Sequence, residues 1–245
     1  MTSAAPEDQL RLLSLQALDT RIQQLVHAKK THPSLARIAE LDKQIDDLHG
    51  SLVDSRTAVS DLRRELAKAE ADVAQVRARQ AKDQDRLDSG ALGAKDALAV
   101  TEELTSLVRR QAALEEVELE IMERLEAHQD ALDKVEAAHQ QLVDARTAAE
   151  GERDAAFEEI NGQGRTLTAE RKAAAEGIDA GLVAVYDRLR TRLGGTGAAA
   201  LRGGRCEGCG LELNPGDLAV ARSAAADHVV RCEECGRILV RVTDA

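Results

Sequence analysis

A repeat of apolar residues at alternating steps of three and four runs from Ile38 to Val76 and limits most strongly what this chain can fold into. Such a repeat predicts a helix that buries a single stripe against a partner helix, as in a coiled coil. The predicted stripe consists of Ile38, Leu41, Ile45, Leu48, Leu52, Ser55, Val59, Leu62, Leu66, Ala69, Val73 and Val76.

A second repeat follows after the segment from Asp88 to Asp96, where Gly90 and Gly93 interrupt the pattern and indicate a loop at about 88–96. A short loop between two long helices makes them antiparallel neighbours, so the sequence predicts a helical hairpin. The second stripe consists of Leu104, Leu107, Gln111, Leu114, Glu118, Ile121, Leu125, His128, Leu132, Val135, His139 and Leu142.

The first arm also contains an earlier apolar stripe, formed by Leu15, Leu18, Ile22 and Leu25, that is out of phase with the stripe beginning at Ile38. Pro33 lies between the two, and proline removes a helical hydrogen bond and clashes with the preceding turn. We therefore expect a kink near 31–34, within a hairpin domain that covers residues 1–181.

Composition supports long helices over a thick globular core, because the chain has one Phe, one Tyr and no Trp and 31% of its residues are charged. The net charge of −11 disfavours a protein coated with nucleic acid along its length. No apolar run is long enough to span a bilayer and no secretion signal is apparent at the N-terminus. We expect a cytoplasmic protein with no membrane contact and no small-molecule substrate.

The four cysteines form two C-x-x-C pairs, Cys206 with Cys209 and Cys232 with Cys235, each followed directly by glycine. This spacing predicts one structural zinc ion with four cysteine ligands, because a C-x-x-C turn brings two thiolates to one point. Gly210 and Gly236 would supply the positive φ that each turn needs. Four protein ligands leave no open coordination position, which favours a structural role for the metal.

The cysteine spacing allows two other interpretations. A disulfide framework would suit an exported chain, for which no signal is seen. A thioredoxin-like redox pair would require a βαβ context, which the sequence lacks.

Residues 182–245 are predicted as a separate domain, with a short neck helix from Leu182 to Leu193 and a small β zinc ribbon. We expect one strand over 198–206, further strands over 228–232 and 237–242, and a helical turn over 217–222. These strands would form a small antiparallel sheet closed by zinc. The whole chain is then mainly α: a long kinked antiparallel coiled-coil hairpin with a C-terminal ribbon.

The segment from Arg188 to Arg205 contains five arginines and no acidic residue, which makes this neck a candidate phosphate-binding patch. A solvated face carrying helix-end charges explains the same residues equally well, and the scarcity of aromatics disfavours base stacking. The candidate nucleic-acid-binding residues are Arg188, Arg190, Arg192, Arg202 and Arg205.

The order of a coiled-coil hairpin, the Leu87-Asp-Ser-Gly90 tip, Tyr186 in the neck and the segment from Cys206 to Val240 resembles a bacterial C4-type zinc-ribbon family with a long N-terminal coiled coil. The Ala- and Arg-rich sequence is most similar to actinobacterial, mycobacterial-type members. The resemblance implies a kinked hairpin with a terminal zinc ribbon. It also implies the four cysteines as ligands. Flagellated members of the family contact sigma factor 54, one branch binds messenger RNA, and relatives in intracellular pathogens bind secretion components.

The sequence therefore predicts a non-enzymatic adaptor or regulator. Its coiled coil would bind protein partners, and its ribbon with the Arg-rich neck would bind RNA, DNA or the transcription machinery. The alternative is a protein-only chaperone or scaffold in which the ribbon is a structural cap. An enzyme is a third class, for which the sequence offers no nucleophile with a base and no open metal site.

Overall fold

The structure is a computed structural model that describes residues 3–242. It confirms the predicted fold class of a helical hairpin followed by a small β region. The helices are α1 (Pro6–Lys30), α2 (Pro33–Asp88), α3 (Ala94–Glu176), α4 (Ala180–Arg192) and α5 (Pro215–Ser223). The strands are β1 (Ala198–Arg202), β2 (Arg205–Cys206), β3 (Val230–Arg231) and β4 (Ile238–Arg241). None of the helices in this described range is both long and apolar enough to cross a membrane.

The chain divides into two compact units. The hairpin unit is Ala36–Glu150, and the ribbon unit combines the residues up to Leu35 with those from Gly151 onward. The predicted domain boundary between residues 181 and 182 lies inside the ribbon unit and stays a prediction.

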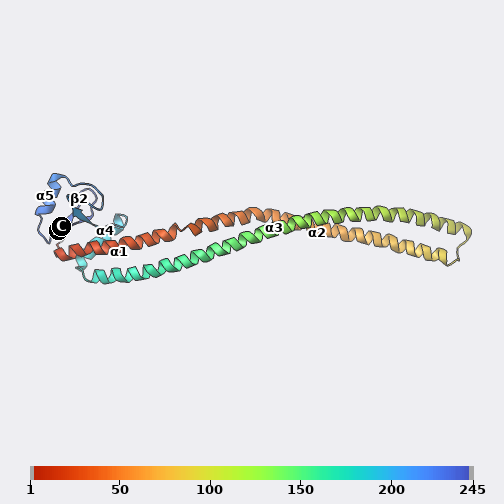
Figure 1. The fold of residues 1–245 in the computed structure, drawn as a ribbon, viewed down its shortest axis with the longest axis horizontal. Coiled ribbons are helices and arrows are strands. Elements are labelled where there is room, and N and C mark those ends of the chain that lie inside the picture. Colours follow the sequence, from red (N-terminus) through yellow and green to blue (C-terminus); the bar gives the residue numbers. More distant parts are fainter. Residues whose placement is uncertain (1–2, 243–245) are drawn as a thin grey trace. The chain divides into compact units, whose positions relative to one another are not determined.

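In the hairpin unit, α2 and α3 run antiparallel and are joined by a short loop at residues 89–93 (Figure 1). The predicted stripe of α2 is the buried one, since Ile38, Leu62, Val73 and Val76 are all at most 9% exposed. Leu52 and Val59 pack against Leu132 of α3 in one apolar cluster. A thin seam of this kind leaves most of each helix in water, which explains the high content of charged residues.

Ion pairs join the two helices of the hairpin unit outside the apolar seam. Arg56 contacts Glu136 at 2.8 Å and Arg79 contacts Glu103 at 3.0 Å, so each pair joins α2 to α3. Arg77 and Glu115 form a third pair of this type. These groups are largely exposed, and exposed pairs of this kind contribute ~0–1 kcal/mol each.

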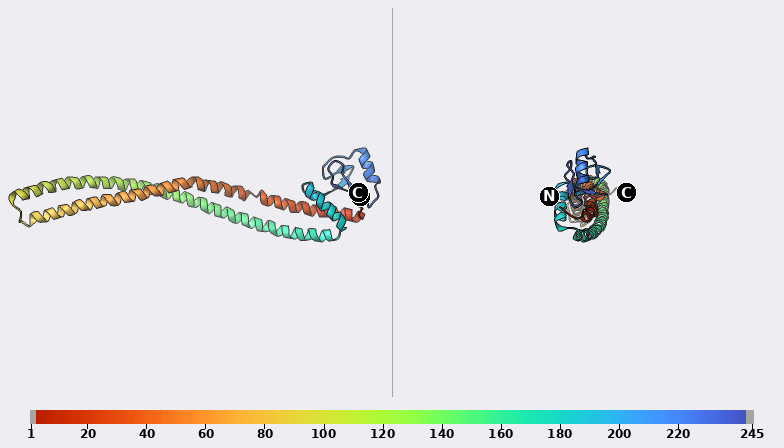
Figure 2. Two further views of the ribbon diagram at one scale, coloured as in Figure 1. Left: turned by 180° about the vertical axis from the view of Figure 1, so that it is seen from behind. Right: turned by 90° about the vertical axis from the view of Figure 1, so that its left-hand side faces the viewer.

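In the ribbon unit, α1 lies alongside the last turns of α3, and α4 packs close to both (Figure 2). Between α1 and α2 the helix is interrupted at Thr31 and His32, and Pro33 takes the first helical position, where its missing N–H costs no hydrogen bond. The interruption falls within the segment where the sequence predicts a kink.

The neck helix α4 is defined at its start by Asp179, whose side chain accepts a hydrogen bond from the backbone N–H of Leu182 at 2.8 Å. Its apolar face enters a buried cluster that joins the helices to the sheet. The members of this cluster with no exposed surface are Leu12, Leu15, Leu182, Tyr186, Ile238 and Val240. The ribbon is therefore packed onto helices α1 and α4 and is not a loosely tethered module.

The sheet has the strand order β2-β1-β4-β3, and the expectation of an all-antiparallel sheet is wrong. Strands β1 and β4 are parallel, with Ala198 opposite Ile238 and Leu201 opposite Arg241. Each end of the ribbon is an antiparallel hairpin of its own, β1 with β2 and β3 with β4. The two hairpins join through their longer strands, and the crossover that contains α5 makes this joint parallel.

The expected single strand over 198–206 is also wrong, because Gly203 and Gly204 turn the chain back between β1 and β2. Their φ angles of +56° and +83° suit a two-residue turn that only glycine adopts readily. The helical turn expected over 217–222 is confirmed as part of α5, whose N-cap is Asn214.

Candidate metal centre and neck

The two cysteine pairs lie at the ends of the short strands, Cys206 in β2 and Cys232 directly after β3. Each pair is wound into a tight turn in which the N–H of the following glycine donates to the carbonyl of the first cysteine. These bonds, Gly210 to Cys206 and Gly236 to Cys232, are both 2.8 Å long. Both glycines have positive φ, +75° and +73°, as the sequence predicts.

The four thiols fit a tetrahedral zinc ion. All four sulfur atoms lie within 4.8 Å of one another, and Sγ of Cys206 is 3.9 Å from Sγ of Cys235. A tetrahedral site with Zn–S bonds of about 2.3 Å separates its sulfurs by roughly 3.8 Å, which is close to this spacing. Four sulfurs complete the coordination shell, so the site holds one zinc ion as a structural centre.

The thiols differ in their surroundings. Burial raises the pKa of Cys206 and raises that of Cys232 to about 12, although backbone N–H groups of the knuckles oppose the effect. Burial also opposes ionisation of Cys235, but hydrogen bonds from the backbone and side chain of Arg237 outweigh it and lower its pKa to about 7. N–H donors therefore already face the sulfurs, as a thiolate ligand set requires.

Next to the ribbon lies a buried polar network centred on Asp19 of α1, whose side chain is 3% exposed. Its carboxylate receives the hydroxyl of Tyr186 at 2.7 Å and pairs with Arg171 at 3.2 Å and Arg190 at 3.4 Å. Arg171 also pairs with Asp187 of α4. Burial, followed by the bond to Asp19, raises the pKa of Tyr186. The network thus joins α1, α3 and α4 through paired charges.

Gln16 of α1 extends this network to the sheet. Its side-chain oxygen accepts the backbone N–H of Gly197 at 2.8 Å, and its side-chain nitrogen donates to the carbonyl of Gly195 at 3.1 Å. Gly197 lies so close to Tyr186 that a Cβ there would approach the ring within 2.9 Å. Neither Asp19 nor Gln16 stood out in the sequence, because both belong to an ordinary helical pattern and their partners lie more than 150 residues away.

The five neck arginines are not brought together as one free patch. Arg190 belongs to the Asp19 network, Arg202 pairs with Glu207 at 3.3 Å, and Arg205 pairs with Glu212 at 3.2 Å. Arg188 and Arg192 are exposed on α4 and have no carboxylate partner among the described residues. Nucleic-acid binding by the neck stays a prediction, and it now rests mainly on Arg188 and Arg192.

Two later arginines, which the sequence did not single out, have structural positions. Arg237 donates to the carbonyls of Thr196 at 3.1 Å and Leu193 at 3.4 Å, and thereby joins the second knuckle to the end of α4. Arg241 of β4 donates to the carbonyls of Ala224 at 2.6 Å and Ala225 at 2.8 Å, just after α5.

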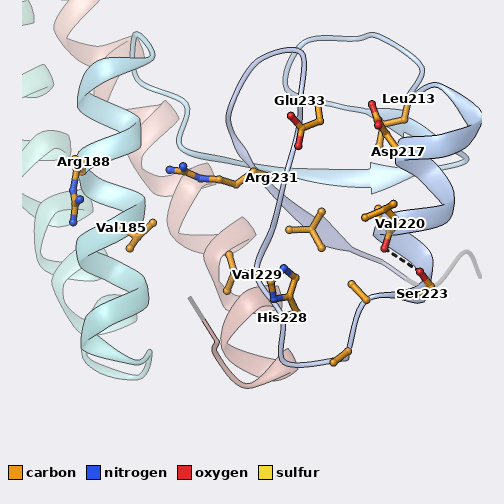
Figure 3. A pocket seen from close by; sticks show the side chains of 14 residues that line it. Val185, Arg188, Leu213, Asp217, Val220, Ser223, His228, Val229, Arg231 and Glu233 are labelled. Carbon is orange, nitrogen blue, oxygen red and sulfur yellow. Dashed lines mark hydrogen bonds between the residues drawn. The ribbon is translucent and has the colours of Figure 1, made fainter. Parts of the chain in front are cut away.

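A groove of about 760 Å³ lies between α4, α5 and the segment 224–233 (Figure 3). Its apolar lining includes Val185 of α4, Val220 of α5 and Val229 before β3. Arg188 and Arg231 also line it. This groove is separate from the four cysteines and from the Asp19 network.

Comparisons with known proteins agree with the two parts of this architecture. The CT398-like coiled coil hairpin domain matches residues 15–194, and the C4-type zinc ribbon domain matches residues 205–239. An uncharacterized protein of Mycobacterium tuberculosis is 34% identical over 239 residues, which cover 98% of this chain and 97% of that protein.

Two solved structures are similar over nearly the whole chain. A structure from Mycobacterium smegmatis has a TM-score of 0.86 and 35% identity, and covers 98% of this chain and 100% of its own. CT398 from Chlamydia trachomatis has a TM-score of 0.66 and 23% identity, with 96% and 98% covered, and supports the fold alone.

Proposed function

The chain belongs to the family with a CT398-like coiled coil hairpin domain and a C4-type zinc ribbon, and from this we propose that it is a non-enzymatic zinc-binding adaptor. The hairpin would bind protein partners along its exposed faces, and the ribbon with its neck would form a second contact surface. Zinc would act only in folding, because four sulfurs leave no position for a substrate or water. Four unpaired thiols as ligands suit the reducing cytoplasm.

One observation carries this proposal: the ribbon is fixed to the helices by the Asp19 and Gln16 contacts and by the apolar cluster around Tyr186. A module held in this way presents its surface in a defined orientation to α1 and α4. Pre-organisation of this kind favours binding, because less conformational freedom is lost when the partner docks.

The hairpin unit offers a surface suited to protein partners. Several large apolar side chains of α3 lie outside the buried seam and are exposed to solvent: Leu98, Val108, Leu119 and Met122. Exposed apolar residues on a helix that is already paired are typical of surfaces that another helix covers.

A second candidate function is binding of nucleic acid or of the transcription machinery through the neck. Arg188 and Arg192, one turn apart on α4, are its best support, since both are exposed and unpaired by any described carboxylate. Arg202 and Arg205 contribute less to a phosphate-binding field, because Glu207 and Glu212 neutralise them.

The experiment that tests the adaptor is affinity capture with the zinc-loaded full chain from its native lysate, with and without nuclease. We expect a reproducible set of proteins that persists after nuclease treatment. A set that disappears with nuclease would favour the second candidate, and no retained protein in either arm would contradict the adaptor. A charge-reversed pair, Arg188→Glu with Arg192→Glu, would lose the nuclease-sensitive set, whereas Arg202→Glu with Arg205→Glu is the matched control.

The protein-only scaffold remains the alternative in which the ribbon is a cap. It predicts that every partner captured by the full chain also binds a variant with charge reversals across the neck. The proteins captured by this variant can be compared directly with those captured by the wild type. Arg188 and Arg192 do not take part in the buried network, so reversing their charge leaves that network intact.

A further inference from the structure

The groove between α4, α5 and segment 224–233 is used by neither the zinc site nor the Asp19 network (Figure 3). We propose that it binds a short segment of a partner protein in which apolar side chains adjoin carboxylates. Its volume of about 760 Å³ is large enough for a few side chains. This inference rests on the proposed adaptor function and names the chemistry of the partner at the ribbon.

Apolar side chains from three parts of the chain form much of the groove. Val185 comes from α4, Leu213 and Val220 from α5 and the residues before it, and Val229 and Val230 from the entry to β3. Val220 is 67% exposed, although it lies on a helix with a buried face. A partner side chain placed here would remove apolar surface from water on both sides.

Two cations from different elements line the same groove. Arg188 of α4 and Arg231 of β3 are both exposed, and neither has a carboxylate partner in the described range. Figure 3 shows the Arg231 side chain pointing toward α4, the helix that carries Arg188. Elsewhere in the neck, Arg190, Arg202 and Arg205 are paired with acids. Guanidinium groups bind carboxylates in bidentate geometry, so two free ones select an acidic segment.

The other charges of the groove favour a peptide over a nucleic acid. Asp217 and Glu233 also line it, on the side toward α5, and would repel a continuous chain of phosphates. None of the residues lining the groove is Phe, Tyr or Trp, so the imidazole of His228 is the one ring that the groove offers to a base. A peptide can place a single carboxylate near the arginines and leave the acidic side to neutral groups.

The walls of the groove are held in place before anything binds. Helix α5 is capped by Asn214, whose side chain accepts a hydrogen bond from the backbone N–H of Asp217 at 2.9 Å. At its other end, Arg241 gathers the carbonyls of Ala224, Ala225 and Ala226 at 2.6 to 2.9 Å. A preformed groove binds a short segment at a lower entropic cost than a mobile loop would.

The test is selection of random dodecapeptides displayed on phage against the zinc-loaded full chain. We expect the selected peptides to combine large aliphatic or aromatic residues with Asp or Glu. The strongest peptide is then synthesised with a fluorescent label and titrated by anisotropy. The double variant Arg188→Glu, Arg231→Glu and the single variant Val220→Asp should each weaken its binding about tenfold or more.

Matched controls come from the same helices. Arg192 on α4 and Arg222 on α5 are exposed arginines that do not line the groove, so Arg192→Glu and Arg222→Glu should leave affinity within about twofold. Each variant is checked for one zinc per chain and an unchanged circular dichroism spectrum. If Val220→Asp fails this check, the smaller change Val220→Ser takes its place.

Three results would overturn the groove proposal. They are selection without acidic–apolar enrichment, binding that is insensitive to Arg188, Arg231 and Val220, and groove-dependent binding of a uridine dodecamer in place of the peptide. Failure of the adaptor itself is distinguishable, because the wild-type chain would then capture no protein from lysate. If the groove alone fails, the double variant captures the same proteins as the wild type.

Discussion

The ribbon unit and the hairpin unit are stabilised in different ways. In the hairpin, Leu52, Val59 and Leu132 form a thin seam and the charged pairs around it are exposed. In the ribbon unit, a metal centre, a buried carboxylate with two arginines and a compact apolar cluster depend on one another. Single substitutions should therefore have local and modest effects in the hairpin unit and large effects that spread through the whole ribbon unit.

The largest effect is expected from loss of the metal. Cys232→Ser removes one of four ligands, and structural zinc contributes on the order of 10 kcal/mol to small domains of this type. We expect zinc content to fall and amides of residues 198–241 to lose protection from hydrogen exchange, while residues 36–150 stay protected. Loss of most helical signal at 222 nm would contradict this difference between the two units, because it would show that the hairpin also depends on zinc.

The second largest effect is expected from removal of the buried carboxylate of Asp19. Asp19→Ala removes the buried carboxylate that pairs with Arg171 and Arg190 and leaves both arginines to Asp187, whose side chain is 37% exposed; breaking such a buried pair costs about 3–5 kcal/mol. Asp42→Ala in the hairpin is the matched control, because Asp42 pairs with Arg146 but its side chain is 46% exposed. We expect the control to cost ~1 kcal/mol or less in urea unfolding. Equal costs would show that the two units do not differ in this respect.

The third effect is expected from a substitution in the apolar seam of the hairpin unit. Val59→Ala removes two methyl groups from a side chain that is 2% exposed and should lower the free energy of unfolding by about 2 kcal/mol. Val53→Ala, six residues earlier on α2 and 46% exposed, should cost less than about 0.5 kcal/mol. Thermal unfolding followed by circular dichroism measures both, and similar values would contradict the burial of Val59 in the seam.

The smallest effect at neutral pH is expected from Tyr186→Phe, which removes the bond to Asp19 at a cost of about 1.5 kcal/mol. The informative measurement for this variant is the pH dependence of its free energy of unfolding. The pKa of Tyr186 is raised in the folded chain, so its contribution is complete below the ordinary tyrosine pKa of about 10 and is lost as pH rises above it. The wild type should therefore lose stability above this pH more steeply than Tyr186→Phe, and parallel curves would contradict the assignment.

Patterns that involve neighbours in the sequence predicted much of this structure. The heptad positions of Leu52, Val59 and Val73 are buried, and the four cysteines converge as their spacing indicates. Periodicity and knuckle spacing report on local geometry, which a single segment determines.

Interactions between distant segments could not be read in the same way. Arg190 looked like a free cation because nothing near it in the sequence identifies Asp19 as its partner. The parallel joint of β1 and β4 escaped detection for a related reason: each strand alone reads as half of an antiparallel hairpin. Pairings that depend on which surfaces meet are set by tertiary packing, which propensity and spacing do not encode.

The ion pairs across the hairpin contribute little to stability, yet they determine which hairpin forms. Arg77 faces Glu115, and a slip by one heptad would place it opposite Val108 or Met122. The apolar seam alone would tolerate such a slip, since one leucine or valine replaces another every seven residues. Charges of opposite sign on the two helices therefore select one register from several that the seam would accept.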